Sequence, residues 1–144
     1  MKIRKGKISD LKRLMKFLNE TPELSAGMAG ETYSEEWVRS CLTDKKMNLV
    51  LIAEYNREII GFLMAEMWRG KKYSFTSDIF VKPEYRRQRI ATKLKEEHER
   101  ICKNQGIKKI LGLVLATNKK MHKFMEKDHY KRGSAFYLYE KRLK

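Results

Sequence analysis

Hydrophobic and polar residues follow two different periods along the chain, and the two periods together predict a mixed fold. Apolar residues recur at helical spacing in the segments 11–18, 37–42 and 88–104. Strand-like apolar runs occupy 49–54, 59–68 and 73–81, and short polar turns separate them. Sequential strands joined by short turns favour an antiparallel meander. The pattern therefore predicts a sheet accompanied by helices.

Shorter patterns at the two ends of the chain add further elements. A strand is expected over 1–5, another over 107–115, a short helix over 118–127 and a final strand over 135–143. Ser9 is positioned to cap the first long helix. Thr32 and Glu35 form a capping-box pattern that is expected to open the second helix.

Length and composition favour one globular domain. The chain has 144 residues, of which 42% are hydrophobic, and it contains no repeat or linker, so a single domain over 1–144 is expected. The longest apolar stretches, 48–54 and 59–65, are far shorter than the roughly 20 residues that span a bilayer. The first residues lead into no apolar signal segment, so we expect a cytoplasmic protein without a membrane partner.

The charge is strongly positive. Lys and Arg number 33 against 18 Asp and Glu, which gives a formal net charge of +15. Such a chain fits a nucleic-acid binder, an enzyme with a polyphosphate cofactor, or a Lys-rich protein of a thermophile. Cys41 and Cys102 lack metal-ligand spacing and are expected as reduced thiols, so no metal site is predicted.

One stretch carries a family resemblance. Residues 78–94 read DIFVKPEYRRQRIATKL, a strand followed by a polar turn and the start of a helix. The stretch resembles the acetyl-CoA signature of the GNAT N-acetyltransferases, in which Arg/Gln-x-x-Gly-x-Gly/Ala opens the helix. Arg86 and Ala91 match the first and last positions, whereas Arg89 replaces the family glycine and Arg87 replaces another common glycine. A turn of this kind aims backbone N–H groups and a helix dipole at one point, which suits a pyrophosphate.

The resemblance extends over nearly the whole chain. Ile3-Arg4 with Asp10-Leu11 is similar to the family's opening strand and helix, and 59–62 to its hairpin. The run 118–130 is similar to Asn-x-x-Ala-x-x-Leu-Tyr-Glu-Lys-x-Gly-Phe, with Met125 in place of the Tyr and His129 in place of the Gly. The implied fold is the α/β GNAT fold, a mixed, mostly antiparallel sheet flanked by helices, with the fourth and fifth strands splayed apart.

The resemblance also implies where acetyl-CoA, the co-substrate, binds. Backbone groups of Phe80 and Val81 would bind pantetheine and polarise the thioester, with Asn118 and Met125 at the neighbouring strand and helix. The pyrophosphate would lie at the turn formed by Arg86, Arg87, Gln88, Arg89, Ile90, Ala91 and Thr92. Arg89 either obstructs this cradle or supplies charge to it, the second provided that its φ is negative.

The reaction requires a base, because an alkyl ammonium with a pKa of about 10 must lose a proton before it attacks. Asp78 is the best-placed carboxylate near the bulge of the fourth strand, and Ser77 could hold a water; a salt bridge is the other role open to Asp78. Met125 cannot donate a proton to the departing thiolate. Tyr130, which we take as the candidate catalytic residue, Tyr85 or Tyr137 could take this role, or solvent could protonate the thiolate.

The charge distribution bears on the acceptor. Between Phe17 and Val38 there is no Lys or Arg, although this segment contains several glutamates. In the GNAT fold it forms a wall of the acceptor site, so Glu31, Glu35 and Glu36 are expected to attract a cationic amine. A solvated acidic face that pairs with the basic remainder is the alternative.

The expected function is an N-acetyltransferase that moves acetyl from acetyl-CoA to a primary amine of a small molecule or protein by direct transfer in a ternary complex. Two alternatives stay open: a catalytically weak acetyl-CoA-binding protein, which would explain Arg89 and Met125, and a basic nucleic-acid-binding module. Nucleic acid is not the expected partner because no known motif for it occurs. The sequence leaves open the identity of the amine, the general acid and the oligomeric state, with a homodimer among the options.

Overall fold

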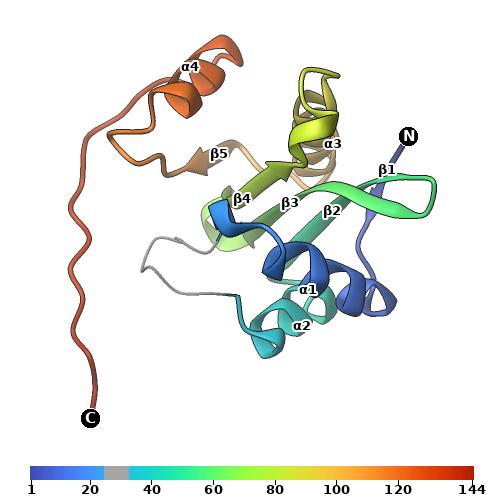
Figure 1. Cartoon of the computed structure of the whole chain (residues 1–144). Helices are drawn as coiled ribbons and strands as arrows, with labels where there is room; N and C mark the ends of the chain where they lie inside the picture. The colour runs from blue at the N-terminus through green and yellow to red at the C-terminus, as the bar shows by residue number, and fades with distance from the viewer. Residues whose placement is uncertain (25–32) are drawn as a thin grey trace. The chain divides into compact units, whose positions relative to one another are not determined.

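The computed structural model describes residues 1–24 and 33–144 (Figure 1). These residues form two compact units, 1–112 and 113–144. No helix within the described part is long and apolar enough to cross a membrane. The larger unit contains the sheet and most of the helices.

The sheet of the larger unit has the order β1-β2-β3-β4-β5. All neighbours are antiparallel except β4 and β5, which are parallel. The predicted meander and the mixed, mostly antiparallel sheet are therefore confirmed. The strands are β1 (Lys2–Lys5), β2 (Asn48–Tyr55), β3 (Glu58–Trp68), β4 (Tyr73–Val81) and β5 (Lys109–Gly112).

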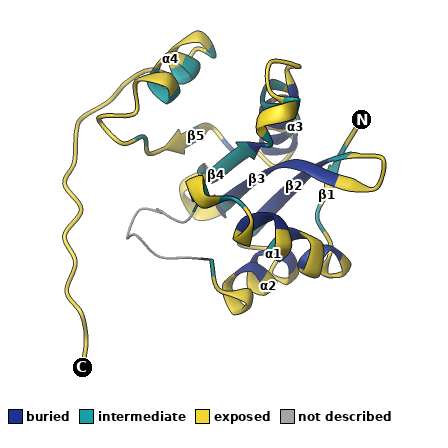
Figure 2. Ribbon diagram, in the orientation of Figure 1, coloured by how far each residue is buried: buried dark blue, intermediate teal, exposed yellow. Residues whose placement is uncertain are grey.

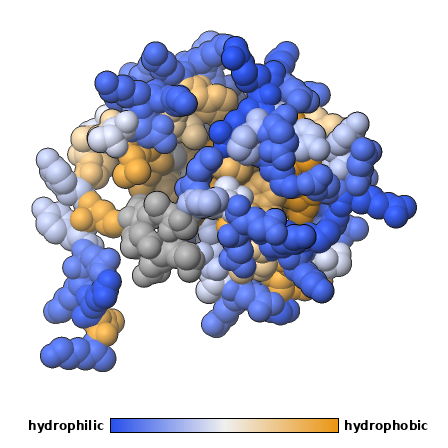
Figure 3. All heavy atoms as spheres, in the orientation of Figure 1, coloured by the Kyte–Doolittle hydropathy of each residue, from blue (hydrophilic) through white to orange (hydrophobic). Residues whose placement is uncertain are grey.

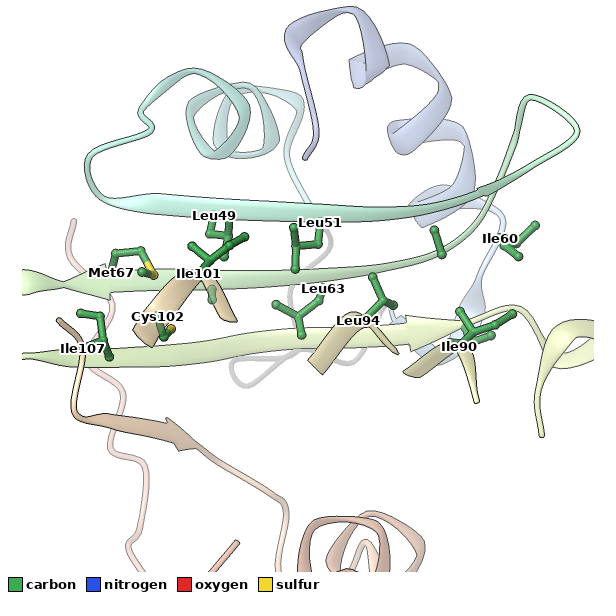
Figure 4. Packing of buried hydrophobic residues seen from close by; sticks show 13 residues of the cluster. Leu49, Leu51, Ile60, Leu63, Met67, Ile90, Leu94, Ile101, Cys102 and Ile107 are labelled. Carbon is green, nitrogen blue, oxygen red and sulfur yellow. The ribbon is translucent and has the colours of Figure 1, made fainter. Parts of the chain in front are cut away.

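Helices cover both faces of this sheet because its central strands are apolar on both sides. On one face, α1 (Leu11–Asn19) and α2 (Glu35–Thr43) pack over alternate residues of β2 and β3, including Phe62 and Met64. On the other face, α3 (Ile90–Asn104) packs over residues such as Leu51 and Leu63. Figure 2 shows β2 and β3 almost wholly buried, and Figure 4 shows α3 side chains among those of the strands.

The helix starts differ from two sequence predictions. Ser9 does not cap α1, because a short 3-10 turn over Ile8–Asp10 precedes the helix. The organising residue is Asp10, which is 1% exposed and accepts hydrogen bonds from the Lys7 N–H at 2.9 Å and from Arg4 at 2.8 Å. Thr32 lies outside the described residues. The observed cap of α2 is Ser34, whose hydroxyl accepts from the Trp37 N–H at 3.1 Å.

The smaller unit contains α4 (Lys119–Lys127), which Asn118 caps by accepting the Met121 N–H at 3.1 Å. The predicted final strand over 135–143 is wrong, since no regular structure occurs there. A strand needs a neighbouring strand for its backbone hydrogen bonds, and α4 is the only regular element described within 113–144. The expected strand over 107–115 is also shorter than predicted, because β5 ends at Gly112.

A buried polar contact links α3 to β4. His98 is 1% exposed, and its Nε2 lies 2.7 Å from the hydroxyl oxygen of Ser74, which is also buried. The Ser74 hydroxyl also lies within donating distance of the Glu66 carbonyl, at 3.2 Å. Burial, reinforced by the charge of Lys95, lowers the pKa of His98 from 6.5 to about 4. His98 is therefore a neutral part of the core at neutral pH.

This lowered pKa predicts an acid-sensitive fold. Between pH 6.5 and about 4 the unfolded chain takes up a proton on residue 98 that the folded chain does not, so stability falls as pH falls through this window. The loss should approach about 3 kcal/mol by the lower limit. Urea unfolding at several pH values should show a smaller loss in His98→Gln than in the wild type. The control His122→Gln should keep the wild-type slope, and equal slopes in all three proteins would contradict the prediction.

Candidate active site

The outer edge of β4 is open over its second half. β4 pairs with β5 only from Tyr73 to Thr76, opposite the segment Lys109–Gly112. Within residues 1–24 and 33–112, no strand partner lies on that side of Ser77–Val81. The splay between the fourth and fifth strands that the resemblance implies is therefore present.

The register identifies the peptide groups that face this opening. The Lys82 N–H donates to the carbonyl of Ile60 in β3 at 2.9 Å, so Lys82 and Ile60 are a hydrogen-bonded pair of the antiparallel ladder. Hydrogen-bonded and non-hydrogen-bonded pairs alternate along an antiparallel ladder. Phe80 is consequently bonded to β3, whereas the peptide groups of Ile79 and Val81 point toward the opening.

Asp78 follows a bulge in β4. Met64 is opposite Asp78 but Ala65 is opposite Thr76, so Ser77 is the extra residue of the bulge. Ser77 is exposed, and its hydroxyl donates to the Met64 carbonyl at 3.2 Å. Bulges bend a strand and redirect the side chains beside them. Because directly opposed residues share a face, Asp78 lies on the face covered by α1 and α2.

The Asp78 carboxylate is held by an aromatic residue from the start of α2. The Tyr33 hydroxyl donates to Asp78 Oδ1 at 2.5 Å, and the Tyr33 ring lies 5.5 Å from that of Trp37, centroid to centroid. Burial raises the pKa of Asp78 above its usual range, although the hydrogen bonds from Tyr33 and Ser77 partly offset this effect. Burial and the neighbouring carboxylate also raise the pKa of Tyr33, which keeps its hydroxyl protonated.

Gly61 allows the backbone of β3 to lie close to the open half of β4. A Cβ atom at this position would lie 2.9 Å from the Phe80 carbonyl oxygen and 3.2 Å from Val81 Cγ2. The first separation is shorter than real Cβ contacts, and it involves backbone, which cannot move aside cheaply. A side chain here would therefore push β4 outward beside Asp78.

The turn that precedes α3 keeps the conformation of a glycine-rich turn without any glycine. Arg87 has φ +63° and Arg89 has φ +61°, both in the left-handed region. These are the positions at which the GNAT signature has glycine or commonly uses it. The negative φ expected as the condition for Arg89 to supply charge is therefore not observed, and the positive φ nevertheless leaves the side chain exposed. The Arg89 side chain is 76% exposed, and its guanidinium lies 3.9 Å from Glu96.

Helix α3 begins at Ile90, immediately after this turn. Gln88 is exposed, Ala91 packs against the core, and Thr92 is half-buried in the first turn. Arg86 does not extend freely from the turn. Its Nε donates to the Val81 carbonyl at 2.9 Å, its guanidinium pairs with Glu23 at 3.0 Å, and it lies 5.0 Å from the centroid of the Phe80 ring.

The acidic segment is only partly described. Glu31 lies outside the described residues. Glu35 and Glu36 are exposed in the first turn of α2, and Glu35 pairs with Arg39 at 3.4 Å. Figure 3 shows that the face in view is largely hydrophilic, as expected for a chain with 33 Lys and Arg.

Three predicted site residues belong to the smaller unit. Asn118 caps α4, as described above. Met125 is half-buried on α4, and its carbonyl accepts from the N–H of Tyr130 at 3.0 Å. His129, which replaces the family glycine after this helix, has φ +64°. The smaller unit therefore also keeps a left-handed position without glycine.

The sequence patterns do not identify two residues near Asp78. Tyr33 was not singled out, because its contact with Asp78 joins residues 45 positions apart. Glu66 was also missed, although its position on β3 places it one step along the same face from Met64, the partner of Asp78. The alternation of side chains between the two faces of β3 already places Glu66 on the same face as Met64. No group of three His, Cys, Asp or Glu side chains that could hold a metal occurs among the described residues.

Comparison with known proteins identifies the family of this arrangement. A spermidine N(1)-acetyltransferase from Thermoplasma acidophilum is 29% identical over 120 residues, covering 74% of this chain and 73% of that protein. An aminoglycoside acetyltransferase from an uncultured soil metagenomic sample, solved in complex with sisomicin, superposes with a TM-score of 0.80 at 15% identity and covers 99% of this chain and 96% of its own.

A second solved structure has the same fold. AAC(6')-Iy in complex with the bisubstrate analog CoA-S-monomethyl-acetylneamine has a TM-score of 0.79 at 18% identity, covering 99% of this chain and 98% of that one. The model of the acetyltransferase (GNAT) family matches residues 11–130, which include β2 to β5 and α1 to α4 of the described part of the chain. The resemblance in the sequence is confirmed, and this chain belongs to the GNAT acetyltransferase family.

Proposed function

We propose that this chain transfers an acetyl group from acetyl-CoA to a primary amine of a small cationic molecule, by direct transfer in a ternary complex. The observation that carries the proposal is the position of Asp78, a half-buried carboxylate beside the open edge of β4. The family match spans both units, so we also propose that they work as one acetyltransferase domain.

The open edge supplies hydrogen-bond donors for the thioester. The N–H groups of Ile79 and Val81 face the opening and need a partner there. A donor fixed in a strand stabilises the negative charge that develops on the acetyl oxygen without reorganising during the reaction. This role falls to Ile79 and Val81 rather than to Phe80, whose peptide groups are bonded to β3.

The turn before α3 suits the pyrophosphate of CoA. Left-handed residues turn successive backbone N–H groups toward one concave point, and the first N–H groups of α3 lack partners within the helix. The exposed guanidinium of Arg89 adds positive charge at the same turn. Backbone donors, helix dipole and side-chain charge therefore favour the same anionic group.

Asp78 is proposed as the base that takes a proton from the acceptor amine, directly or through a water near Ser77. Its raised pKa brings it closer to that of the amine, which makes the transfer less unfavourable than for an ordinary aspartate. The Tyr33 hydroxyl holds the carboxylate in one orientation. The departing thiolate also needs a proton, which solvent can supply because a thiol is acidic enough to leave without a dedicated acid.

The described residues favour a cationic acceptor. Asp78 carries negative charge beside the aromatic rings of Tyr33 and Trp37, and aromatic faces attract cations. The relatives include a spermidine acetyltransferase and aminoglycoside acetyltransferases, whose named substrates are also amines. Glu35 and Glu36 would act at longer range from the start of α2.

Thiol release from acetyl-CoA in the presence of an amine panel tests the function. The wild type should release CoA with a cationic primary amine, and Asp78→Asn should lower kcat by about a hundredfold or more while CoA binding, measured by calorimetry, stays unchanged. Asp44→Asn, which removes an exposed carboxylate at the end of α2, should match the wild type. CoA binding without release for any amine would instead support a CoA-binding protein.

The hydrogen bond from Tyr33 gives a separate prediction about pH. This bond lowers the pKa of Asp78 against the effect of burial, so Tyr33→Phe should raise that pKa further. Because the base must be deprotonated, activity is lost as pH falls through its pKa, and the acidic limb of kcat/KM should move to higher pH in Tyr33→Phe. An unmoved limb with a lower plateau would show that Asp78 is not the titrating base.

Arg89 should affect stability and cofactor affinity in opposite directions. Arg89→Gly removes a left-handed non-glycine residue and should raise the free energy of unfolding by about 1 kcal/mol. It should also weaken CoA binding about fivefold, because a charge near the phosphates is lost. The matched control is Arg57→Gly, which relieves the same conformation at φ +63° in the β2–β3 turn and should stabilise without changing CoA affinity. Tighter CoA binding by Arg89→Gly would show that Arg89 obstructs the turn.

A further inference from the structure

We infer that Glu66 on β3 selects acceptors that carry a second cationic centre, so that the preferred substrate is a short aliphatic diamine or polyamine. This inference rests on the proposed function, because it assigns to Glu66 the binding of the amine that is not acetylated. Asp78 would take the proton from the reacting amine, and Glu66 would bind the second, unreacted ammonium group.

The sheet places the two carboxylates on the same face. Met64 is opposite Asp78, and Glu66 follows Met64 by two residues on β3. Diagonal neighbours of this kind have Cα atoms about 7–8 Å apart. Burial raises the pKa of the Cys41 thiol to about 11, and the charges of Glu66 and Asp78 contribute to this, so both lie within electrostatic reach of the same face of α2.

The Glu66 carboxylate is fixed by aromatic residues. The indole N–H of Trp68 donates to Glu66 Oε2 at 2.8 Å. The Trp68 ring stacks on Phe75 with centroids 5.8 Å apart and an interplanar angle of 11°, and Phe75 is the cross-strand partner of Glu66. Lys71 lies 5.8 Å from the centroid of the Trp68 ring. Trp68 is thus held in place and serves as the positioning residue for Glu66.

Both carboxylates lack a cationic partner within the described residues, although the chain has 33 Lys and Arg. Elsewhere in the larger unit, carboxylates such as Asp10, Glu54 and Glu97 pair with arginines. Asp78 and Glu66 instead accept hydrogen bonds from Tyr33 and Trp68, which carry no charge. A half-buried carboxylate without a countercharge favours a cation that arrives from outside.

The two separated charges favour a flexible diamine over a monoamine. A monoamine can engage only one of the two carboxylates, whereas a diamine leaves its unreacted ammonium free to pair with Glu66. Charge-assisted hydrogen bonds of this kind are among the stronger polar contacts in proteins. The second contact should therefore lower KM for the diamine without changing the chemistry at Asp78.

Kinetics with putrescine and n-butylamine, which have the same carbon chain and two or one amine, test the inference. In the wild type kcat/KM should be at least tenfold higher for putrescine, and Glu66→Gln should remove this preference by raising the putrescine KM while leaving n-butylamine within about twofold. Trp68→Phe, which removes the N–H that fixes Glu66 together with part of the indole ring, should give part of the same loss. Glu99→Gln, a half-buried carboxylate on the opposite face of the sheet, should keep the wild-type preference.

Calorimetry of putrescine binding to wild type and Glu66→Gln separates this inference from the proposed function. If no amine is acetylated but putrescine binds and Glu66→Gln weakens it at least tenfold, the proposed function fails and the role of Glu66 stands. Equal effects of Glu66→Gln on both amines, or unchanged putrescine affinity and KM, would overturn the role of Glu66.

Discussion

The pairing of β4 is the constraint on which the rest of the site depends. Its inner side is bonded to β3 along the strand, with a bulge at Ser77, whereas its outer side is bonded to β5 only as far as Thr76. Beyond that point the outward peptide groups of Ile79 and Val81 have no strand partner among residues 1–24 and 33–112. The bulge places Asp78 beside them, so the end of the β5 pairing and the bulge together bring unpaired backbone donors close to a carboxylate.

The turn before α3 shows how a conformation can persist after the residue that favours it has been replaced. Arg87 and Arg89 have positive φ values where the family signature has glycine or commonly uses it. Each such position costs about 1–2 kcal/mol in a residue with a Cβ atom. The cost is sustained because Ile90, Leu94 and Ile101 anchor α3 in the core immediately afterwards. The backbone path is therefore set by packing on both sides of the turn.

Much of the fold was predictable because it depends on local periodicity. The strands 49–54, 59–68 and 73–81 and the helix over 88–104 follow from spacing alone. The final strand over 135–143 failed because a strand depends on a partner that periodicity cannot identify. The location of Asp78 beside a bulge agrees with the resemblance, and its role stays a prediction. Tyr33 and Glu66 were missed because their relation to Asp78 arises from tertiary contact and strand register.

Amide chemical shifts measured by NMR during titration with CoA test the central claim most directly, because they report on individual peptide groups of β4. The largest changes are expected at the N–H groups of Ile79 and Val81 and at those of the turn from Arg87 to Ala91, whereas Phe80, which is bonded to β3, should change little. A change at Phe80 as large as those at Ile79 and Val81 would contradict the proposed binding of CoA at the open edge of β4. Changes confined to residues away from β4 and the start of α3 would also contradict it.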